Sequence, residues 1–266
     1  MERIVAFSGG KDSTAMLLRM IELDIQIDEI VFADTLFEFP ELYEYIERVE
    51  KHIGRKITIL KPHPDLFKKW FYGKLTRGKI KGRTRGFPLR LYPCFWTREA
   101  KIKPLAKIKD KGDITYIGIA YDEQDRMSEV DGNLRYPLVD WKWTEQDCID
   151  YLNKKNMFNP LYVNFDRLGC WHCPKQSIKS LYVLWKNYPE LWKELIWWDN
   201  ENVRLTGMNI KEKPIIEIQK DFENGKMPKK LPKYDCWNGC ESVKSAFKEK
   251  QKGLGLFMEE PKNLNT

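Results

Sequence analysis

The stretch Ile4-Val5-Ala6-Phe7-Ser8-Gly9-Gly10-Lys11-Asp12-Ser13-Thr14 decides the fold, because an apolar strand, a glycine turn and a helical pattern stand there in that order. The helical pattern continues through Ala15, Met16, Leu17, Leu18, Met20, Ile21 and Leu23. Two glycines let the backbone turn sharply, and Ser13 and Thr14 can cap a helix whose first N–H groups point at a ligand. Lys11 adds a point charge for phosphate oxygens. We therefore expect a phosphate-binding loop here; a plain glycine turn between a strand and a helix is the alternative.

The loop differs from a Walker A sequence at two positions. Asp12 rather than Ser or Thr follows Gly10-Lys11, and Val5 stands where that motif has its first glycine. A chemistry other than ordinary γ-phosphate transfer is therefore indicated.

Predicted strands and helices alternate over the first 65 residues. Strands are predicted at residues 4–7, 30–33 and 57–60, and helices are predicted to begin at residues 13 and 40. A fourth strand is predicted at residues 115–120, and a capped helix at residues 144–153. This alternation is typical of a parallel sheet covered by helices on both faces, with ligands at the carboxyl ends of the strands.

The chain changes character after Pro174 and becomes rich in Trp, Lys and Glu. Apolar residues then recur at helical spacing: Leu181, Leu184, Trp185, Leu191, Trp192, Leu195, Ile196 and Trp197. We predict a nucleotide-binding domain over residues 1–175 and a helical C-terminal subdomain over residues 176–266. The aromatic residues there are expected to form a core rather than a base-stacking surface.

Composition is typical of a folded cytoplasmic enzyme. The chain has 266 residues, 42% of them hydrophobic, and a formal net charge of +7. Apolar runs are shorter than the roughly 20 residues that a membrane span needs, and we expect neither a membrane partner nor a signal peptide. The positive charge favours anionic partners but is also common on soluble proteins.

Four of the six cysteines form two closely spaced pairs, Cys170/Cys173 and Cys236/Cys240. Four thiolates brought together would suit either Zn²⁺ or an iron–sulfur cluster. We therefore predict one metal centre on these four residues, with unligated structural cysteines as the alternative. Cys148 lies in a predicted amphipathic helix and is expected in the core.

A basic segment at residues 66–93 is predicted to be a mobile loop, because four glycines interrupt it and acidic residues are absent between Asp65 and Glu99. Its cations and those just after it are Lys68, Lys69, Lys74, Arg77, Lys79, Lys81, Arg83, Arg85, Arg90 and Arg98. Aromatic residues are interleaved with them. Two interpretations stay open: a lid that closes over ATP phosphates, and a groove for a nucleic-acid backbone with aromatic stacking.

Further motifs follow the loop in order: Asp34-Thr35 with Phe39-Pro40-Glu41, Cys94 with Lys101-Ile102-Lys103-Pro104-Leu105, the segment 118–126 ending in Arg126, Tyr136-Pro137-Leu138, Asn159-Pro160-Leu161-Tyr162 and Gly169-Cys170-Trp171-His172-Cys173-Pro174. Together these motifs resemble the PP-loop ATP pyrophosphatases, and within them the phosphoadenylylsulfate (PAPS) reductase-like family, over about residues 1–180. Leu36 stands where that family has a glycine, and Ala120 where it has an arginine.

The resemblance implies an α/β fold with a mostly parallel, five-stranded adenine-nucleotide α-hydrolase-like (HUP-type) sheet and helices on both faces. It implies attack on the α-phosphorus of ATP with loss of pyrophosphate, assisted by Mg²⁺ that Asp12 helps to position. The catalytic residues would be Lys11, Asp12 and Arg126. The nucleotide-binding residues would be Ser8, Gly9, Gly10, Lys11, Asp12, Ser13, Asp34 and Thr35.

The resemblance also favours a [4Fe–4S] cluster over Zn²⁺ at the cysteines, with Cys94 as a competing ligand. Adenylylation of an oxygen followed by sulfur insertion then becomes the expected function, most simply thiolation of a nucleic acid such as DNA phosphorothioation or modification of a tRNA base. A cysteine desulfurase or another sulfur-donor protein would be a partner. One alternative is a sulfonucleotide reductase, although the sequence lacks that family's Glu-Cys-Gly-Leu-His segment. The other is a nucleotide-binding subunit without catalysis.

Overall fold

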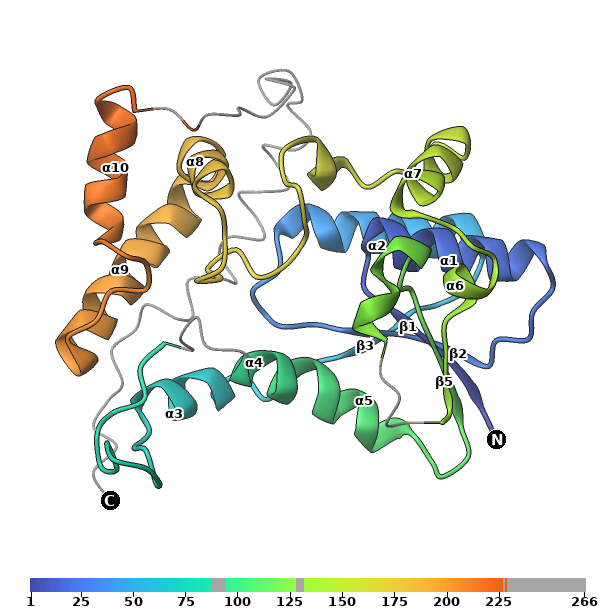
Figure 1. Ribbon diagram of the computed structural model, residues 1–266, viewed down its shortest axis with the longest axis horizontal. Helices are drawn as coiled ribbons and strands as arrows, with labels where there is room; N and C mark the ends of the chain where they lie inside the picture. Colours follow the sequence, from blue (N-terminus) through green and yellow to red (C-terminus); the bar gives the residue numbers. More distant parts are fainter. Residues whose placement is uncertain (88–93, 128–131, 227, 229–266) are drawn as a thin grey trace. The chain divides into compact units, whose positions relative to one another are not determined.

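The computed structural model describes residues 1–87, 94–127, 132–226 and 228 (Figure 1). The chain divides into two compact units. The first unit comprises Met1–Lys69, Arg90–Tyr162 and Arg167–Cys170. The second comprises Trp70–Leu89, Val163–Asp166 and Trp171–Thr266. Cys236 and Cys240, two of the predicted metal ligands, lie outside the described residues.

A five-stranded sheet organises the first unit, in the order β3-β2-β1-β4-β5. Every pairing among its strands is parallel, and Val5 pairs with Ile30 on one side and Tyr116 on the other. The predicted α/β fold with a five-stranded sheet is therefore confirmed. The strands are β1 (Arg3–Phe7), β2 (Glu29–Ala33), β3 (Thr58–Leu60), β4 (Ile114–Ile117) and β5 (Leu134–Arg135).

Helices lie on both faces of this sheet, as right-handed crossovers between parallel strands require. In Figure 1, α1 (Lys11–Glu22) and α2 (Pro40–Ile53) lie on one face and α5 (Lys103–Ile108) lies on the other. The central strand β1 buries Ile4, Val5 and Phe7, which fits a strand covered on both sides. Three other short helices belong to this unit, α4 (Phe95–Thr97), α6 (Pro137–Asp140) and α7 (Glu145–Lys154). A fourth, α3 (Leu66–Tyr72), spans the boundary between the units.

The start of α1 differs from the prediction in one respect. The helix begins at Lys11, and Gly10 occupies the N-cap without a side-chain hydrogen bond, so the expectation that Ser13 and Thr14 cap it is wrong. Both hydroxyls instead donate back to the Gly10 carbonyl, Ser13 Oγ at 3.1 Å and Thr14 Oγ1 at 2.8 Å. The left-handed turn is completed at Gly9, where φ is +71°, so the helix can begin earlier. Lys11 and Asp12 consequently lie in its first turn.

The described part of the second unit is helical after residue 177, as the apolar spacing predicts, with α8 (Ile178–Asn187), α9 (Pro189–Thr206) and α10 (Ile215–Glu223). Trp192 and Trp198 are buried, whereas Trp185 and Trp197 are partly exposed, so the aromatic residues of these helices contribute to a core only in part. Asp199 ties the turn between α9 and α10, because its carboxylate accepts hydrogen bonds from the amides of Ile210 and Ile215 at 2.6 and 2.8 Å. Among the described helices, none is long and apolar enough to cross a membrane.

Candidate phosphate-binding site

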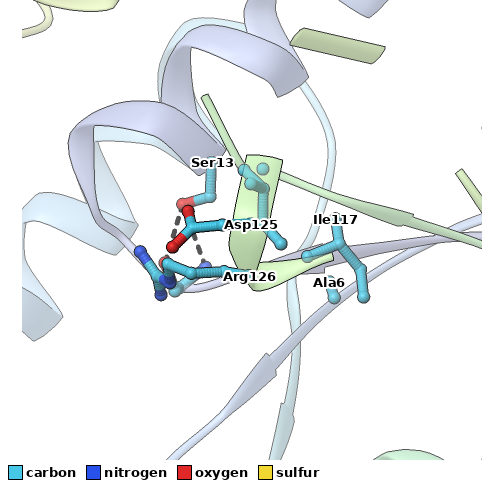
Figure 2. Close-up of a pocket in the computed structure, with 8 residues that line it drawn as sticks. Ala6, Ser13, Ile117, Asp125 and Arg126 are labelled. Carbon is cyan, nitrogen blue, oxygen red and sulfur yellow. Dashed lines mark hydrogen bonds between the residues drawn. The ribbon is translucent and has the colours of Figure 1, made fainter. Parts of the chain in front are cut away.

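The loop between β1 and α1 is held in shape by a pair of serines. The hydroxyls of Ser8 and Ser13 lie 2.9 Å apart, and the Ser8 amide donates to Ser13 Oγ at 3.2 Å (Figure 2). Gly9 packs against α2 so closely that a Cβ atom there would lie 2.5 Å from Leu42 Cδ1. The loop is therefore pre-formed, and a side chain at residue 9 would force it to move.

Amide groups of the loop and of the first turn of α1 make this end of the helix suitable for an anion. The Gly10 amide donates to Ser8 Oγ at 3.3 Å, and the Lys11 amide donates to the Tyr162 hydroxyl at 3.2 Å. The next amides, those of Asp12 and Ser13, belong to the first turn, where a helix provides no backbone acceptor. Unpaired amides at a helix N-terminus bind phosphate oxygens.

A pocket of about 620 Å³ opens beside this loop, at the carboxyl ends of β1 and β4. Figure 2 shows Ser13, Asp125 and Arg126 lying together in it. The predicted phosphate ligand Arg126 is thus near the loop, although the phosphate contact itself stays a prediction. Arg126 Nη1 lies 2.5 Å from Glu123 Oε2, and this hydrogen bond raises the pKa of the guanidinium. The full lining is Ala6, Ser8, Ser13, Ile117, Gly118, Ile119, Asp125 and Arg126.

Gly118 lets the end of β4 approach the loop backbone. A Cβ atom at this residue would lie 2.7 Å from both the amide nitrogen and the Cα of Ser13. Real Cβ atoms essentially never approach another atom so closely, and here the obstacle is backbone rather than a flexible side chain. The sequence motif at residues 118–126 contained this glycine, but only the structure shows that it lies against the loop at residues 8–13.

Three carboxylates gather beside the loop, from Asp12, Glu123 and Glu145. Oxygen atoms of the three lie within 4.8 Å of one another. Within the described part of the chain, Asp12 Oδ1 is buried and has no hydrogen-bond partner. Hard divalent cations such as Mg²⁺ prefer carboxylate oxygens, so this donor set fits the metal that the sequence predicts.

Lys11 forms ion pairs with two of these carboxylates, those of Glu145 and Asp12 (3.3 Å). Burial alone would lower the pKa of Lys11, but the hydrogen bond to Glu145 and the charge of Asp12 outweigh it and raise the pKa. For Asp12, burial raises the pKa and Lys11 opposes that rise. The Lys11 side chain is therefore charged, and two carboxylates hold it beside the loop.

Glu145 is fixed at the first turn of α7 by a capping box. The Asp147 amide donates to Thr144 Oγ1 at 3.2 Å, and the Thr144 amide donates to Asp147 Oδ2 at 2.9 Å. The Glu145 amide donates to Asp122 Oδ1 at 3.0 Å. The helix predicted to begin at Thr144 is thus confirmed, and its start positions a residue of the acidic cluster.

Thr144→Ala is expected to lower the free energy of unfolding by about 1 kcal/mol, because it removes the N-cap oxygen of α7. The melting temperature should fall by about 2–4 °C for a chain of this size. Thr144→Ser keeps the oxygen and should melt close to the parent. Equal losses for both variants in a thermal unfolding experiment would contradict a role for the cap.

Asp34 and Thr35 stand at the carboxyl end of β2 and are both buried. Asp34 Oδ1 accepts hydrogen bonds from the Leu36 amide at 2.7 Å and the Tyr43 hydroxyl at 2.8 Å, while Thr35 Oγ1 donates to Glu38 at 2.9 Å. Burial raises the pKa of Asp34, and the hydrogen bonds from the Leu36 amide and the Tyr43 hydroxyl oppose that rise. Leu36, which replaces the family's glycine, has a left-handed backbone with φ of +65°. The side chains of Asp34 and Thr35 build this turn, and their expected contact with adenosine stays a prediction.

Two of the predicted metal ligands, Cys170 and Cys173, are described, and both are partly exposed. The Cys170 thiol donates to Thr35 Oγ1 at 3.4 Å, so it lies near the turn after β2. The predicted partners Cys236 and Cys240 are outside the described residues. Cys94, the competing ligand, is also partly exposed. The four-cysteine metal centre therefore stays a prediction.

Cys148 is fully buried in α7, as predicted, and burial raises the pKa of its thiol. His172 is buried between the rings of Phe87 and Trp171, and burial lowers its pKa to about 3. It is therefore neutral near pH 7.

The sequence prediction missed the functional arrangement of Glu123, Glu145 and Tyr162. Glu145 was visible as an acid in the first turn of a capped helix, and Tyr162 was part of the Asn159-Pro160-Leu161-Tyr162 motif. Nothing in the local pattern shows that these segments return to the loop at residues 8–13. The sheet order places β4 beside β1, and Asn159 Nδ2 donates to the Gly9 carbonyl at 2.8 Å, so tertiary contacts bring these segments back to the loop.

Comparison with known proteins supports one family. The phosphoadenosine phosphosulfate reductase domain model matches residues 2–176. An uncharacterized protein of Methanocaldococcus jannaschii is 30% identical over 213 residues, which cover 74% of this chain and 40% of that protein. The adenosine 5′-phosphosulfate reductase of Staphylococcus haemolyticus is 26% identical over 199 residues, covering 69% and 77% of the two chains. The chain thus spans well under half the length of the methanogen relative.

A solved structure, the PAPS reductase of Candida auris in complex with phosphate, is also similar. It shares 18% sequence identity at a TM-score of 0.46, over 65% of this chain and 83% of that one.

Proposed function

Because the chain belongs to the phosphoadenosine phosphosulfate reductase domain family, we propose that it is an enzyme acting on an adenine nucleotide whose phosphates bind at residues 8–13. The proposed reaction is that of an ATP pyrophosphatase. A substrate oxygen attacks the α-phosphorus of ATP, the bond to the bridging oxygen breaks, and pyrophosphate leaves. The product is an adenylylated substrate.

The acidic cluster of Asp12, Glu123 and Glu145 beside the loop is the observation that carries this proposal. Three carboxylates would repel a polyphosphate by themselves, so a bound divalent cation is the simplest reason for placing them there. These three residues would hold Mg²⁺. When bound, Mg²⁺ would neutralise negative charge on the departing pyrophosphate.

The chain's own groups would supply binding and charge stabilisation. Amides of the loop and the first turn of α1, together with the Lys11 ammonium group, would hold the outer phosphates. The Lys11 ammonium group would leave its ion pair with Glu145 and pair with a phosphate oxygen instead. Arg126, which lies in the same pocket, would contact a phosphate and orient it.

For the later step we propose sulfur insertion into a nucleic acid, in which a sulfur nucleophile displaces AMP from the activated position. Two features support this choice. The Cys170/Cys173 pair offers thiolates for a cluster, and the sequence lacks the Glu-Cys-Gly-Leu-His segment that carries the nucleophile of sulfonucleotide reductases. A sulfur-donor protein such as a cysteine desulfurase would supply the sulfur as a persulfide, and a thiol reductant would supply the two electrons that separate the donor cysteine from the transferred sulfur.

A sulfonucleotide reductase is the second candidate, and the comparisons favour it directly. The relative from Staphylococcus haemolyticus is named an adenosine 5′-phosphosulfate reductase, and another from Alkalilimnicola ehrlichii is named a phosphoadenosine 5′-phosphosulfate reductase. Such an enzyme would use the same loop for a nucleotide that already carries sulfate, and it would need no pyrophosphate release.

The two functions are distinguished by their products from protein purified without oxygen. We expect pyrophosphate from ATP when Mg²⁺ and a nucleic-acid acceptor, DNA or tRNA, are present, and none when EDTA removes the metal. Adenylylsulfate or its 3′-phosphorylated form, given with a thiol reductant, should yield no sulfite. Sulfite release without pyrophosphate release would instead establish the reductase. Nucleotide binding with neither product would mean a binding subunit without catalysis.

A further inference from the structure

The basic segment after α3 folds back on itself through a short antiparallel pairing. Residues 74 and 84 form an antiparallel bridge. Hydrogen bonds on either side extend the pairing, from the Leu75 amide to the Arg83 carbonyl at 2.9 Å and from the Arg85 amide to the Gly73 carbonyl at 2.9 Å. We call residues 73–86 the basic ribbon. Its turn contains Gly78 and Gly82, both at positive φ.

The basic ribbon carries a high density of positive charge. Six of its twelve residues from 74 to 85 are cationic, and none is acidic. Five are exposed, and Arg85, which lies over the Trp70 ring at 5.9 Å, is partly exposed. Across the described residues, none of the six forms an ion pair with a carboxylate. The cations are Lys74, Arg77, Lys79, Lys81, Arg83 and Arg85.

Some cations on helices of the chain are instead paired with carboxylates. Arg19, Lys193 and Arg204, for example, each pair with a glutamate three positions away on the same helix. A run of unneutralised cations repels itself, and this repulsion is relieved when a polyanion binds. The charge pattern of the basic ribbon therefore suits binding of a polyanion.

The base of the basic ribbon is fixed within the second unit. The Gly86 amide donates to the Phe71 carbonyl at 3.0 Å, and the Phe87 amide donates to Asn202 Oδ1 at 2.7 Å. Gly86 has a φ of +68°, and a Cβ atom there would lie 2.4 Å from Asn202 Oδ1. The rings of Phe71 and Phe87 pack edge-on against Trp198, with centroids 4.9 and 6.2 Å away. The cations thus project from a defined support.

We propose that the basic ribbon docks into the major groove of duplex DNA, with its Lys and Arg side chains on the phosphodiester backbone. The major groove of B-form DNA is about 12 Å wide and admits a two-stranded β-ribbon, whereas the major groove of A-form RNA is too narrow for protein side chains to read. The inference rests on the proposed function, in which DNA would be the acceptor of sulfur. Its test does not depend on nucleotide turnover.

The test measures binding of the full chain to a labelled duplex of about 20 base pairs, from about 50 to about 200 mM salt. The ribbon variant replaces four exposed cations: Arg77→Gln, Lys79→Gln, Lys81→Gln and Arg83→Gln. The control variant removes four exposed lysines from the first unit: Lys51→Gln, Lys107→Gln, Lys111→Gln and Lys154→Gln. Both variants lose the same charge, so a difference between them reports position rather than net charge.

For the parent, affinity should fall steeply as salt rises. Each phosphate contact contributes about −0.9 to the slope of log affinity against log salt concentration. The slope for the ribbon variant should therefore be shallower than the parent's by about 3 to 4. The control variant should keep the parent's slope. Duplex RNA of the same sequence should bind about tenfold more weakly than DNA, because the ribbon cannot enter its major groove.

Equal binding by the ribbon and control variants would overturn the proposal, and so would duplex RNA binding as tightly as DNA. Weaker ATP binding by the ribbon variant with unchanged DNA binding would make the ribbon a lid and also overturn it. Thermal unfolding of both variants checks that the fold is retained. Ribbon-dependent DNA binding by a protein that releases no pyrophosphate would support this inference while refuting the proposed function.

Discussion

Lys11→Ala and Asp12→Ala are each expected to slow pyrophosphate release from ATP by about 10²–10³-fold, the usual effect of removing one preorganised group that stabilises developing charge. Lys11 is the cation nearest the loop and is poised by Glu145 and Asp12. Asp12 supplies the buried carboxylate oxygen that lacks a partner among the described residues. Initial rates of pyrophosphate formation at saturating ATP and Mg²⁺, with the nucleic-acid acceptor present, would measure both effects.

Lys51→Ala is the matched control for the lysine, because Lys51 is an exposed lysine in the last turn of α2. It should release pyrophosphate at the parental rate. Asp12→Asn keeps the size of the side chain and removes its charge, so it should be nearly as slow as Asp12→Ala. Parental rates for Lys11→Ala and Asp12→Ala would refute the assignment of the loop, provided that both variants melt near the parental temperature.

Gly118→Ala is expected to destabilise the first unit strongly. The new Cβ atom would lie 2.7 Å from the backbone of Ser13, so either β4 or the phosphate loop must shift. Overpacking of this kind costs about 1–3 kcal/mol of stability. The melting temperature should fall by about 2–4 °C for each kcal/mol, and nucleotide affinity should fall with it because the loop is displaced.

Gly132→Ala provides the comparison, because a Cβ atom there would meet no described atom within 4 Å. It should melt within about a degree of the parent, since surface substitutions away from special features usually change stability by less than about 0.5 kcal/mol. If Gly118→Ala also melts like the parent and binds nucleotide equally well, the close approach of β4 to the loop is wrong.

The sheet and its loop could be predicted from sequence because both depend on local signals. Apolar runs of strand length, separated by amphipathic helices, specify parallel strands, and Gly9-Gly10 specifies the turn at the end of the first one. The start of α1 was misplaced by two residues because Ser13 and Thr14 are good cap residues in isolation. In the structure Gly9 ends the turn earlier, and both hydroxyls bond to the Gly10 carbonyl instead.

The acidic cluster and the basic ribbon depend on arrangements that local patterns do not encode. Glu123 and Glu145 meet Asp12 only because β4 inserts beside β1, and single-sequence periodicity contains no strand order. For residues 73–86, the cations and glycines obscured the alternation of apolar and polar residues that usually marks strands. Charge pattern therefore predicted a polyanion partner without predicting the ribbon that would present it.

The ion pair between Lys11 and Glu145 has a thermodynamic consequence. Glu145 can serve a metal fully only when Lys11 leaves it, and Lys11 can serve a phosphate fully only when Glu145 and Asp12 release it. Occupation of either proposed place would therefore lower the free energy needed to occupy the other. Such coupling is reciprocal, so cation and polyphosphate would each raise the affinity for the other by the same factor. At the proposed site, Lys11 would make the two binding events positively cooperative through a single shared side chain.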